Sequence, residues 1–139
     1  MNDILSFFNN SSNSFTIVKM LVPAFMAILF LQSGLDKVFN YTATLDYFKD
    51  HFKNSPLSKT VNLLMPVITF LEISAGFLCA IGTVSMATGN TKWAFWGLVT
   101  AALSFLSLFL GQRLAKDYEG AVSIAIYFTL NLVGLLLLV

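Results

Sequence analysis

Two stretches decide the fold: residues 93–111 read WAFWGLVTAALSFLSLFLG, and residues 121–139 read AVSIAIYFTLNLVGLLLLV. Neither contains a charged residue, and each supplies the roughly 20 mainly apolar residues that a helix needs to cross a bilayer. Because lipid offers no hydrogen-bond partner, the backbone of such a segment must bond within its own helix. Both stretches are therefore predicted to span a membrane.

Two upstream stretches meet the same test with one interruption each. Residues 61–82 (VNLLMPVITFLEISAGFLCAIG) contain a single acid, Glu72, and residues 15–35 carry Lys19 near their start. A lysine so close to a helix end can extend its ammonium to the lipid headgroups. The residues before position 15 contain no basic side chain, which argues against a cleaved signal peptide and for a retained helix. The prediction is an all-α protein whose single membrane domain, residues 1–139, is a four-helix bundle.

The composition excludes several other classes of protein. Only 11% of the 139 residues are charged, against about 25% in soluble domains, and 57% are hydrophobic, which excludes disorder. A net charge of +1 gives no basic patch for nucleic acid, so none is expected as a partner. With one Cys and one His, the chain offers no disulfide, no thiolate cluster and no metal site.

The connection over residues 35–60 is too long to be a bare turn in so small a protein. Within it Tyr41, Leu45, Phe48 and Phe52 recur at helical spacing, with charged residues on the other side. This pattern predicts a short amphipathic helix at the membrane interface, between the first two spans. A second interfacial helix is expected in the N-terminal tail, through four apolar residues: Ile4, Leu5, Phe7 and Phe8.

The basic residues near the spans predict the orientation. With four spans, the loops at 35–60 and 112–120 share one side, and the opposite side has only Lys19 and Lys92. Because cytoplasmic loops carry an excess of Lys and Arg, both loops are predicted to be cytoplasmic and both termini outside, in the cell (inner) membrane. The basic residues of the two loops are Lys37, Lys49, Lys53, Lys59, Arg113 and Lys116.

Glu72 is the first candidate for function, because an acid within a membrane span is costly and marks a functional site by default. It lies about 16 Å along its helix, at 1.5 Å per residue. Asn131 lies at a matching depth in the last span, so the two are expected to hydrogen-bond, with Thr69 and Ser74 completing an intramembrane polar cluster. Such a cluster fits a proton relay, a ligand anchor or a quinone or subunit contact; the alternative is a structural hydrogen bond between helices.

A second candidate group is charged and lies on the predicted cytoplasmic side. It consists of Lys37, Asp36, Arg113 and Lys116. The favoured interpretation is that Lys37 extends to the headgroups and that Arg113 pairs with Asp117 at i,i+4 spacing. The alternative is that Lys37 or Arg113 turns inward and supplies a cation above Glu72.

Three segments together resemble the DoxX family of small membrane proteins: FLQSGLDKVFNY (30–41), LEISAGFLCAIG (71–82) and GQRLAKDYEGA (111–121). Gly34 and Lys37 are similar to a Gly-x-x-Lys at the end of the family's first helix, and Glu72, Gly76 and Gly82 to a Glu followed by small residues and a Gly in the second. The resemblance implies a four-helix bundle associated with terminal oxidases or thiosulfate:quinone oxidoreductase. The paired cysteines of a thiol relay are missing here.

The expected function is therefore a non-catalytic accessory subunit of a larger respiratory or redox membrane complex. Its partners would be other membrane subunits and the bilayer; a quinone or lipid is the expected ligand, with no covalently bound cofactor. Two alternatives stay open. One is a proton-coupled small-solute carrier, acting as an oligomer around Glu72, and the other is a quinone-linked oxidoreductase component with Glu72, Lys37 and Arg113 at the quinone ring.

Overall fold

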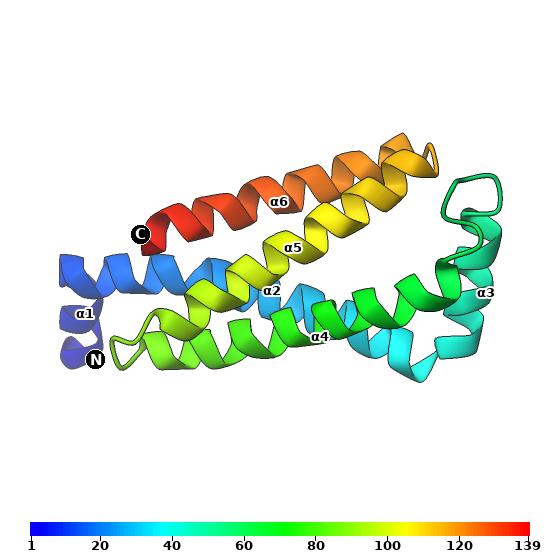
Figure 1. Cartoon of the computed structure of the whole chain (residues 1–139). Coiled ribbons are helices and arrows are strands. Elements are labelled where there is room, and N and C mark those ends of the chain that lie inside the picture. The colour runs from blue at the N-terminus through cyan, green and yellow to red at the C-terminus, as the bar shows by residue number, and fades with distance from the viewer.

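The computed structural model describes the backbone of residues 1–139 and every side chain except those of Phe7 and Phe8. The described chain is helical, which confirms the predicted all-α fold, and its longest connection, residues 52–60, joins α3 to α4 (Figure 1). In chain order the helices are α1 (Asn2–Asn9), α2 (Ser11–Phe39), α3 (Tyr41–His51), α4 (Val61–Met86), α5 (Lys92–Leu114) and α6 (Tyr118–Leu138).

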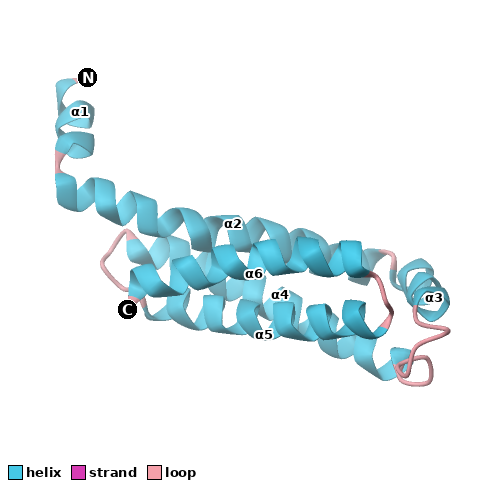
Figure 2. Ribbon diagram, turned by 90° about the horizontal axis from the view of Figure 1, so that it is seen from above, coloured by secondary structure: helices cyan, strands magenta, loops and turns pink.

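Four of these helices, α2, α4, α5 and α6, are long and apolar enough to cross a membrane. They run antiparallel in chain order and form the predicted four-helix bundle (Figures 1 and 2). The largest departure from the predicted spans is in α2, which begins at Ser11 because the Asn10 side chain accepts a hydrogen bond from the Ser12 amide and caps the helix. The protein is a small multi-pass membrane protein.

The bundle is held together by close packing of small residues. α4 packs between α2 and α5, whereas α6 packs chiefly on α5 and meets α2 less extensively. At the end of α4, a Cβ on Gly82 would lie 2.3 Å from the backbone nitrogen of Ala94, so only glycine fits there. Because lipid provides no hydrophobic drive between helices, such close backbone approach is a main source of their association.

The interior combines small and large apolar side chains. Its fully covered members are Met26, Phe30, Ala75, Cys79, Leu98, Ala101 and Phe105. Phe30 and Phe105 meet with ring centroids 4.7 Å apart, which joins α2 to α5. The lone cysteine is therefore a packing residue.

The two short helices lie at opposite ends of the bundle (Figure 2). α3 lies across the end where α2 stops and α4 starts, as expected for the amphipathic segment, and Phe48 is half-buried while Asp46, Lys49 and Asp50 are exposed. α1 turns away from the axis of α2 at the other end. Of the apolar residues expected on α1, Ile4 and Leu5 are exposed, and the side chains of Phe7 and Phe8 lie outside the described residues.

Candidate functional site

Glu72 is enclosed near the middle of α4. Only 1% of its surface is exposed, although α4 is a 26-residue apolar helix with a mean hydropathy of 2.0 in its most apolar window. An ionised carboxylate in such surroundings requires a partner, because its hydration is lost without compensation. The side chains that face Glu72 therefore define the site.

Those partners come from the last turns of α2. The Lys37 ammonium lies 2.8 Å from Glu72 Oε2, and the Ser33 hydroxyl donates a hydrogen bond to Glu72 Oε1 at 3.1 Å. Lys37 Nζ also donates to Ser33 Oγ at 2.8 Å and to the Ser33 carbonyl at 3.3 Å. Ser33 and Lys37 share one helix face because they are four residues apart. The three side chains form one connected polar group, the Lys37–Glu72 site.

This geometry corrects the expectation for Lys37. Its side chain turns inward, with 11% of its surface exposed, and does not extend to the headgroups. The pairing neutralises both charges inside the bundle. Lys37 Nζ and Glu72 Oε2 form an ion pair, but their geometry is not that of a hydrogen bond. Glu72 Oε2 can therefore still accept a hydrogen bond from another group.

Two glycines allow α2 and α4 to approach closely enough for this pairing. A Cβ on Gly34 would lie 2.6 Å from Ile73 Cγ1, and a Cβ on Gly76 would lie 2.9 Å from the Leu31 backbone nitrogen. Each glycine is one turn from a charged member of the site, Gly34 from Lys37 and Gly76 from Glu72. The close approach and the ion pair therefore belong to one arrangement.

A small pocket of about 130 Å³ lies beside Glu72. It is partly open, and its walls come from all four spanning helices. Ser33 and Glu72 contribute its charged and hydroxyl groups, and Tyr127 is the third polar residue of the lining. The remaining lining residues are apolar: Leu29, Phe30, Phe105, Leu108 and Ile124.

Asn131 does not join Glu72. It is fully buried, but its amide Nδ2 donates to the Leu98 carbonyl at 2.9 Å and so connects α6 to α5, while Oδ1 has no hydrogen-bond partner. Thr69 donates to the Met65 carbonyl within α4 at 2.7 Å, and Ser74 is half-buried on the same helix. The expected hydrogen bond between Glu72 and Asn131 is therefore wrong, because equal depth along two helices does not make their side chains face each other.

The other members of the predicted charged group stay at the surface. Asp36 and Lys116 are exposed, and Lys116 adopts a positive φ of 60° in the turn before α6. Arg113 is exposed and lies over the Tyr118 ring, 4.6 Å from its centroid. Asp117 instead caps α6, since its Oδ1 accepts from the Gly120 amide at 3.0 Å. The expected Arg113–Asp117 pair is not among the ion pairs of the described residues.

His51 joins α3 to the remainder of the bundle. Its Nε2 lies 2.9 Å from Gln112 Oε1 and 3.6 Å from Asp117 Oδ2, and the ring stacks on Tyr47. No second metal ligand lies one helical turn from His51 along the chain. Its actual partners are 61 and 66 positions further along the chain, and no local pattern indicates such a contact.

The Lys37–Glu72 site can bind a polar group in apolar surroundings. Its pocket presents a hydroxyl, a carboxylate acceptor and aromatic walls, and in the described part of the chain no three His, Cys, Asp or Glu side chains gather to hold a metal ion. Comparison of the chain with protein-family models, with curated proteins and with solved structures gives no match.

Proposed function

We propose that this protein is a small, non-catalytic subunit of a larger respiratory or redox membrane complex, and that it holds the polar ring of a lipid-soluble quinone beside Lys37 and Glu72. The observation that carries the proposal is the pocket next to the buried ion pair. Electron carriers would be held by the partner subunits, and this chain would contribute binding and assembly.

The energetics of the ion pair support a binding role. A buried ion pair rarely stabilises a fold more than well-packed apolar side chains of the same volume do. A charged pair inside a membrane span is therefore better explained by an interaction with a ligand or proton than by stability alone. Lys37 and Glu72 form such a pair inside the membrane spans. Taken as whole residues, Lys37 is 9% exposed and Glu72 is 1% exposed.

The chemistry of the pocket matches both forms of a quinone. A quinone carbonyl accepts a hydrogen bond, which the Ser33 hydroxyl in the pocket lining can donate by turning from Glu72 to the ligand, and a quinol hydroxyl donates one, which Glu72 Oε2 can accept. Lys37 is not part of the lining and acts through these two residues, which it contacts. Phe30, Phe105 and Tyr127 supply aromatic faces for the ring. A small site with an apolar lining and few polar groups is typical of ligand pockets.

The resemblance to the DoxX family supports the same assignment. Of the residues that carry it, Gly34 and Lys37 on α2 and Glu72 and Gly76 on α4 form the ion pair and permit the close helix approach, and Gly82 packs α4 against α5. A partner complex is also compatible with the exterior, which is apolar over all four spanning helices. Its exposed side chains include Leu21, Ile28, Phe70, Val84, Leu110, Ile126 and Leu136.

The test is purification of the endogenously tagged protein in mild detergent, with protein partners identified by mass spectrometry and quinone measured in a solvent extract. We expect a stoichiometric oxidase or dehydrogenase and bound quinone. The Lys37→Ala variant is expected to retain about tenfold less quinone, since it removes the ammonium that holds Ser33 and Glu72 in place and so weakens their binding of the ligand by about 1.5 kcal/mol. The control is Lys92→Ala, at the first residue of α5 and at the other end of the bundle from Lys37. We expect it to retain quinone at the wild-type level.

Two outcomes contradict the proposal. A preparation without quinone would contradict the proposed ligand. A homo-oligomer without a partner protein would contradict the proposed role as a subunit. The second outcome favours a proton-coupled carrier, for which the relevant observation is that the Glu72 carboxylate lines a partly open pocket. That carrier would show a pH-dependent solute flux in proteoliposomes, which Glu72→Gln abolishes without loss of expression.

The proposed orientation has its own test. In a Cys79→Ala background, we expect Ala87→Cys, in the turn after α4, to react with a membrane-impermeant maleimide on intact cells. Ser58→Cys, exposed in the segment between α3 and α4, is expected to react only after permeabilisation, because the positive-inside bias places that end in the cytoplasm. The reverse pattern of labelling would invert the orientation.

A further inference from the structure

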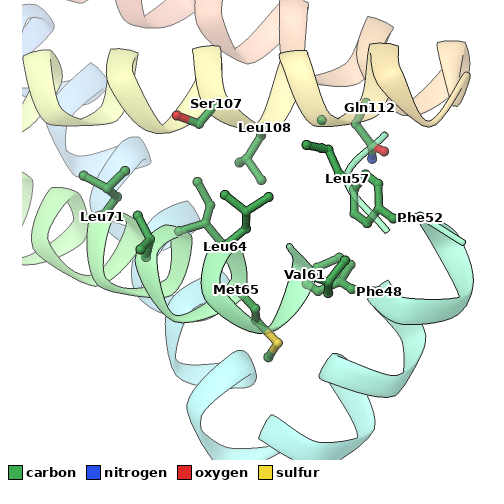
Figure 3. Close-up of a pocket in the computed structure, with 13 residues that line it drawn as sticks. Phe48, Phe52, Leu57, Val61, Leu64, Met65, Leu71, Ser107, Leu108 and Gln112 are labelled. Carbon is green, nitrogen blue, oxygen red and sulfur yellow. The ribbon is translucent and has the colours of Figure 1, made fainter. Parts of the chain in front are cut away.

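A second, larger pocket lies away from the Lys37–Glu72 site. It has a volume of about 170 Å³ and occupies the space between α4 and α5 at the end of the bundle that α3 covers (Figure 3). Its walls come from segments far apart in the chain: Phe48 and Phe52 at the end of α3, Leu57 in the following segment, Val61 and Leu64 on α4, and Leu108 on α5. Neither the ion pair nor its pocket accounts for this space, although Leu108 lines both pockets.

The position of the pocket determines what can enter it. α4 and α5 are spanning helices, whereas α3 lies across their ends at the level where a bilayer changes from hydrocarbon to headgroups. The part lined by Leu64, Leu71 and Leu108 lies within the spans, and the part lined by Phe52 and Gln112 lies beside α3. An occupant therefore has an apolar portion along α4 and α5 and a polar portion next to α3.

The segment after α3 carries positive charge at this end of the pocket. Residues 52–60, of which Phe52 and Leu57 line the pocket, carry Lys53 and Lys59 and no carboxylate, whereas the carboxylates of Asp50 and Asp117 lie beside Lys53 and His51. Lys53 pairs with Asp50 at 2.9 Å in an exposed contact that contributes little, and Lys59 makes no ion pair with any described residue. Gln112 has its Oε1 turned to His51, so its Nε2 remains a donor at the same end.

We propose that this pocket binds one acyl chain of an anionic phospholipid, with the phosphate held beside Lys59. The hydrocarbon chain lies among the leucine and phenylalanine side chains, and the phosphate accepts hydrogen bonds from the lysine ammonium and from the Gln112 amide. α3 forms one wall and is fixed in place by the His51–Gln112 contact. This site is independent of the proposed quinone function.

The experiment uses the full chain reconstituted in nanodiscs that contain phosphatidylglycerol or phosphatidylcholine with a photoreactive group on one acyl chain. After irradiation, labelled residues are identified by mass spectrometry. We expect labelling to concentrate on residues 48–71 and 107–112, and to be stronger for phosphatidylglycerol. Lys59→Gln should lower phosphatidylglycerol labelling about fivefold, since one lysine near the membrane surface contributes about 1 kcal/mol of attraction to anionic lipid, whereas Lys92→Gln at the other end should not.

Variants that fill the pocket test its position. A Cβ on Gly111 would lie 3.6 Å from Phe52 Cζ, an ordinary contact, so Gly111→Ala should fold and keep the labelling. Gly111→Leu places its added atoms against Phe52 and should remove most labelling of both lipids. Ser107→Phe, which fills the pocket from an exposed position, gives the same test if Gly111→Leu does not fold.

Three outcomes would overturn the proposal. The first is labelling spread evenly over outward residues of the other spans, such as Ile28 on α2 and Ile126 on α6, which means lipid surrounds the bundle without a site. The second is labelling that neither filling variant lowers. The third is equal labelling by both lipids that Lys59→Gln leaves unchanged, which removes the phosphate contact.

Discussion

Replacing Lys37 by Met is expected to lower the free energy of unfolding by about 3 kcal/mol, because it leaves Glu72 as an unpaired charge inside the bundle. Ser33 alone donates to one carboxylate oxygen and carries no charge. The measurement is unfolding by SDS in mixed micelles, followed by the fluorescence of Trp93 and Trp96.

The reciprocal variant is expected to be milder. In Glu72→Gln the lysine loses its counter-ion, but it lies in the last turn of α2 and can redirect its ammonium toward the membrane surface. We expect the free energy of unfolding to fall by about 1 kcal/mol, because the variant loses a hydrogen-bonded contact and leaves no unpaired charge inside the bundle.

The double variant Lys37→Met with Glu72→Met separates charge from packing. Removing both charges while keeping the volume should restore stability to within about 1 kcal/mol of the wild type, because buried ion pairs replaced by apolar residues are often neutral. A double variant as unstable as Lys37→Met would show that an unpaired Glu72 charge is not what destabilises Lys37→Met, and would contradict the role given to the ion pair.

The second large effect is expected at Gly82. In Gly82→Val the new Cβ would lie 2.3 Å from the Ala94 nitrogen and 2.4 Å from its Cα, so α4 and α5 must move apart. Backbone atoms cannot move aside as the end of a flexible side chain can. We therefore expect the free energy of unfolding to fall by about 3 kcal/mol, at the upper end of the costs of overpacking. The same SDS titration measures it, with Trp93 and Trp96 close to the affected contact in α5.

Gly111→Ala is the matched control for this prediction. It adds a Cβ to a buried glycine of α5, the helix against which Gly82 of α4 packs, but the nearest neighbour of that Cβ is the flexible end of Phe52 at 3.6 Å. We expect a free energy of unfolding within about 0.5 kcal/mol of the wild-type value, because the added Cβ causes no steric strain. Equal stability of Gly82→Val and wild type would show that the α4–α5 approach is not a requirement of the fold.

The sequence predicts the fold well because membrane burial imposes a simple rule. Residues 93–111 and 121–139 have no charge, so no arrangement other than a spanning helix satisfies their backbone, and the structure places α5 and α6 there. The helix Tyr41–His51 was predictable from apolar spacing for the same local reason. The positions of the helix ends were predicted less accurately, because a capping residue such as Asn10 extends a helix beyond its apolar part.

The site was predictable only in part. Hydropathy identifies Glu72 as an exceptional residue, but depth along a helix does not give the direction in which a side chain points. Asn131 has the right depth and turns to Leu98, whereas Lys37 near the end of α2 turns to Glu72. The contact depends on the close approach at Gly34 and Gly76, which is a property of two helices together.

The location of the ion pair on the first two spanning helices has a consequence for biosynthesis. Translation produces Lys37 before Glu72, so the lysine has left the ribosome when the acid-bearing helix reaches the insertion machinery. α4 therefore need not enter lipid with an unneutralised carboxylate, because α2 presents the counter-charge and the narrow glycine face beside it. The order of the two charges along the chain means that the buried acid of the first helical hairpin meets its counter-charge when the second span is inserted.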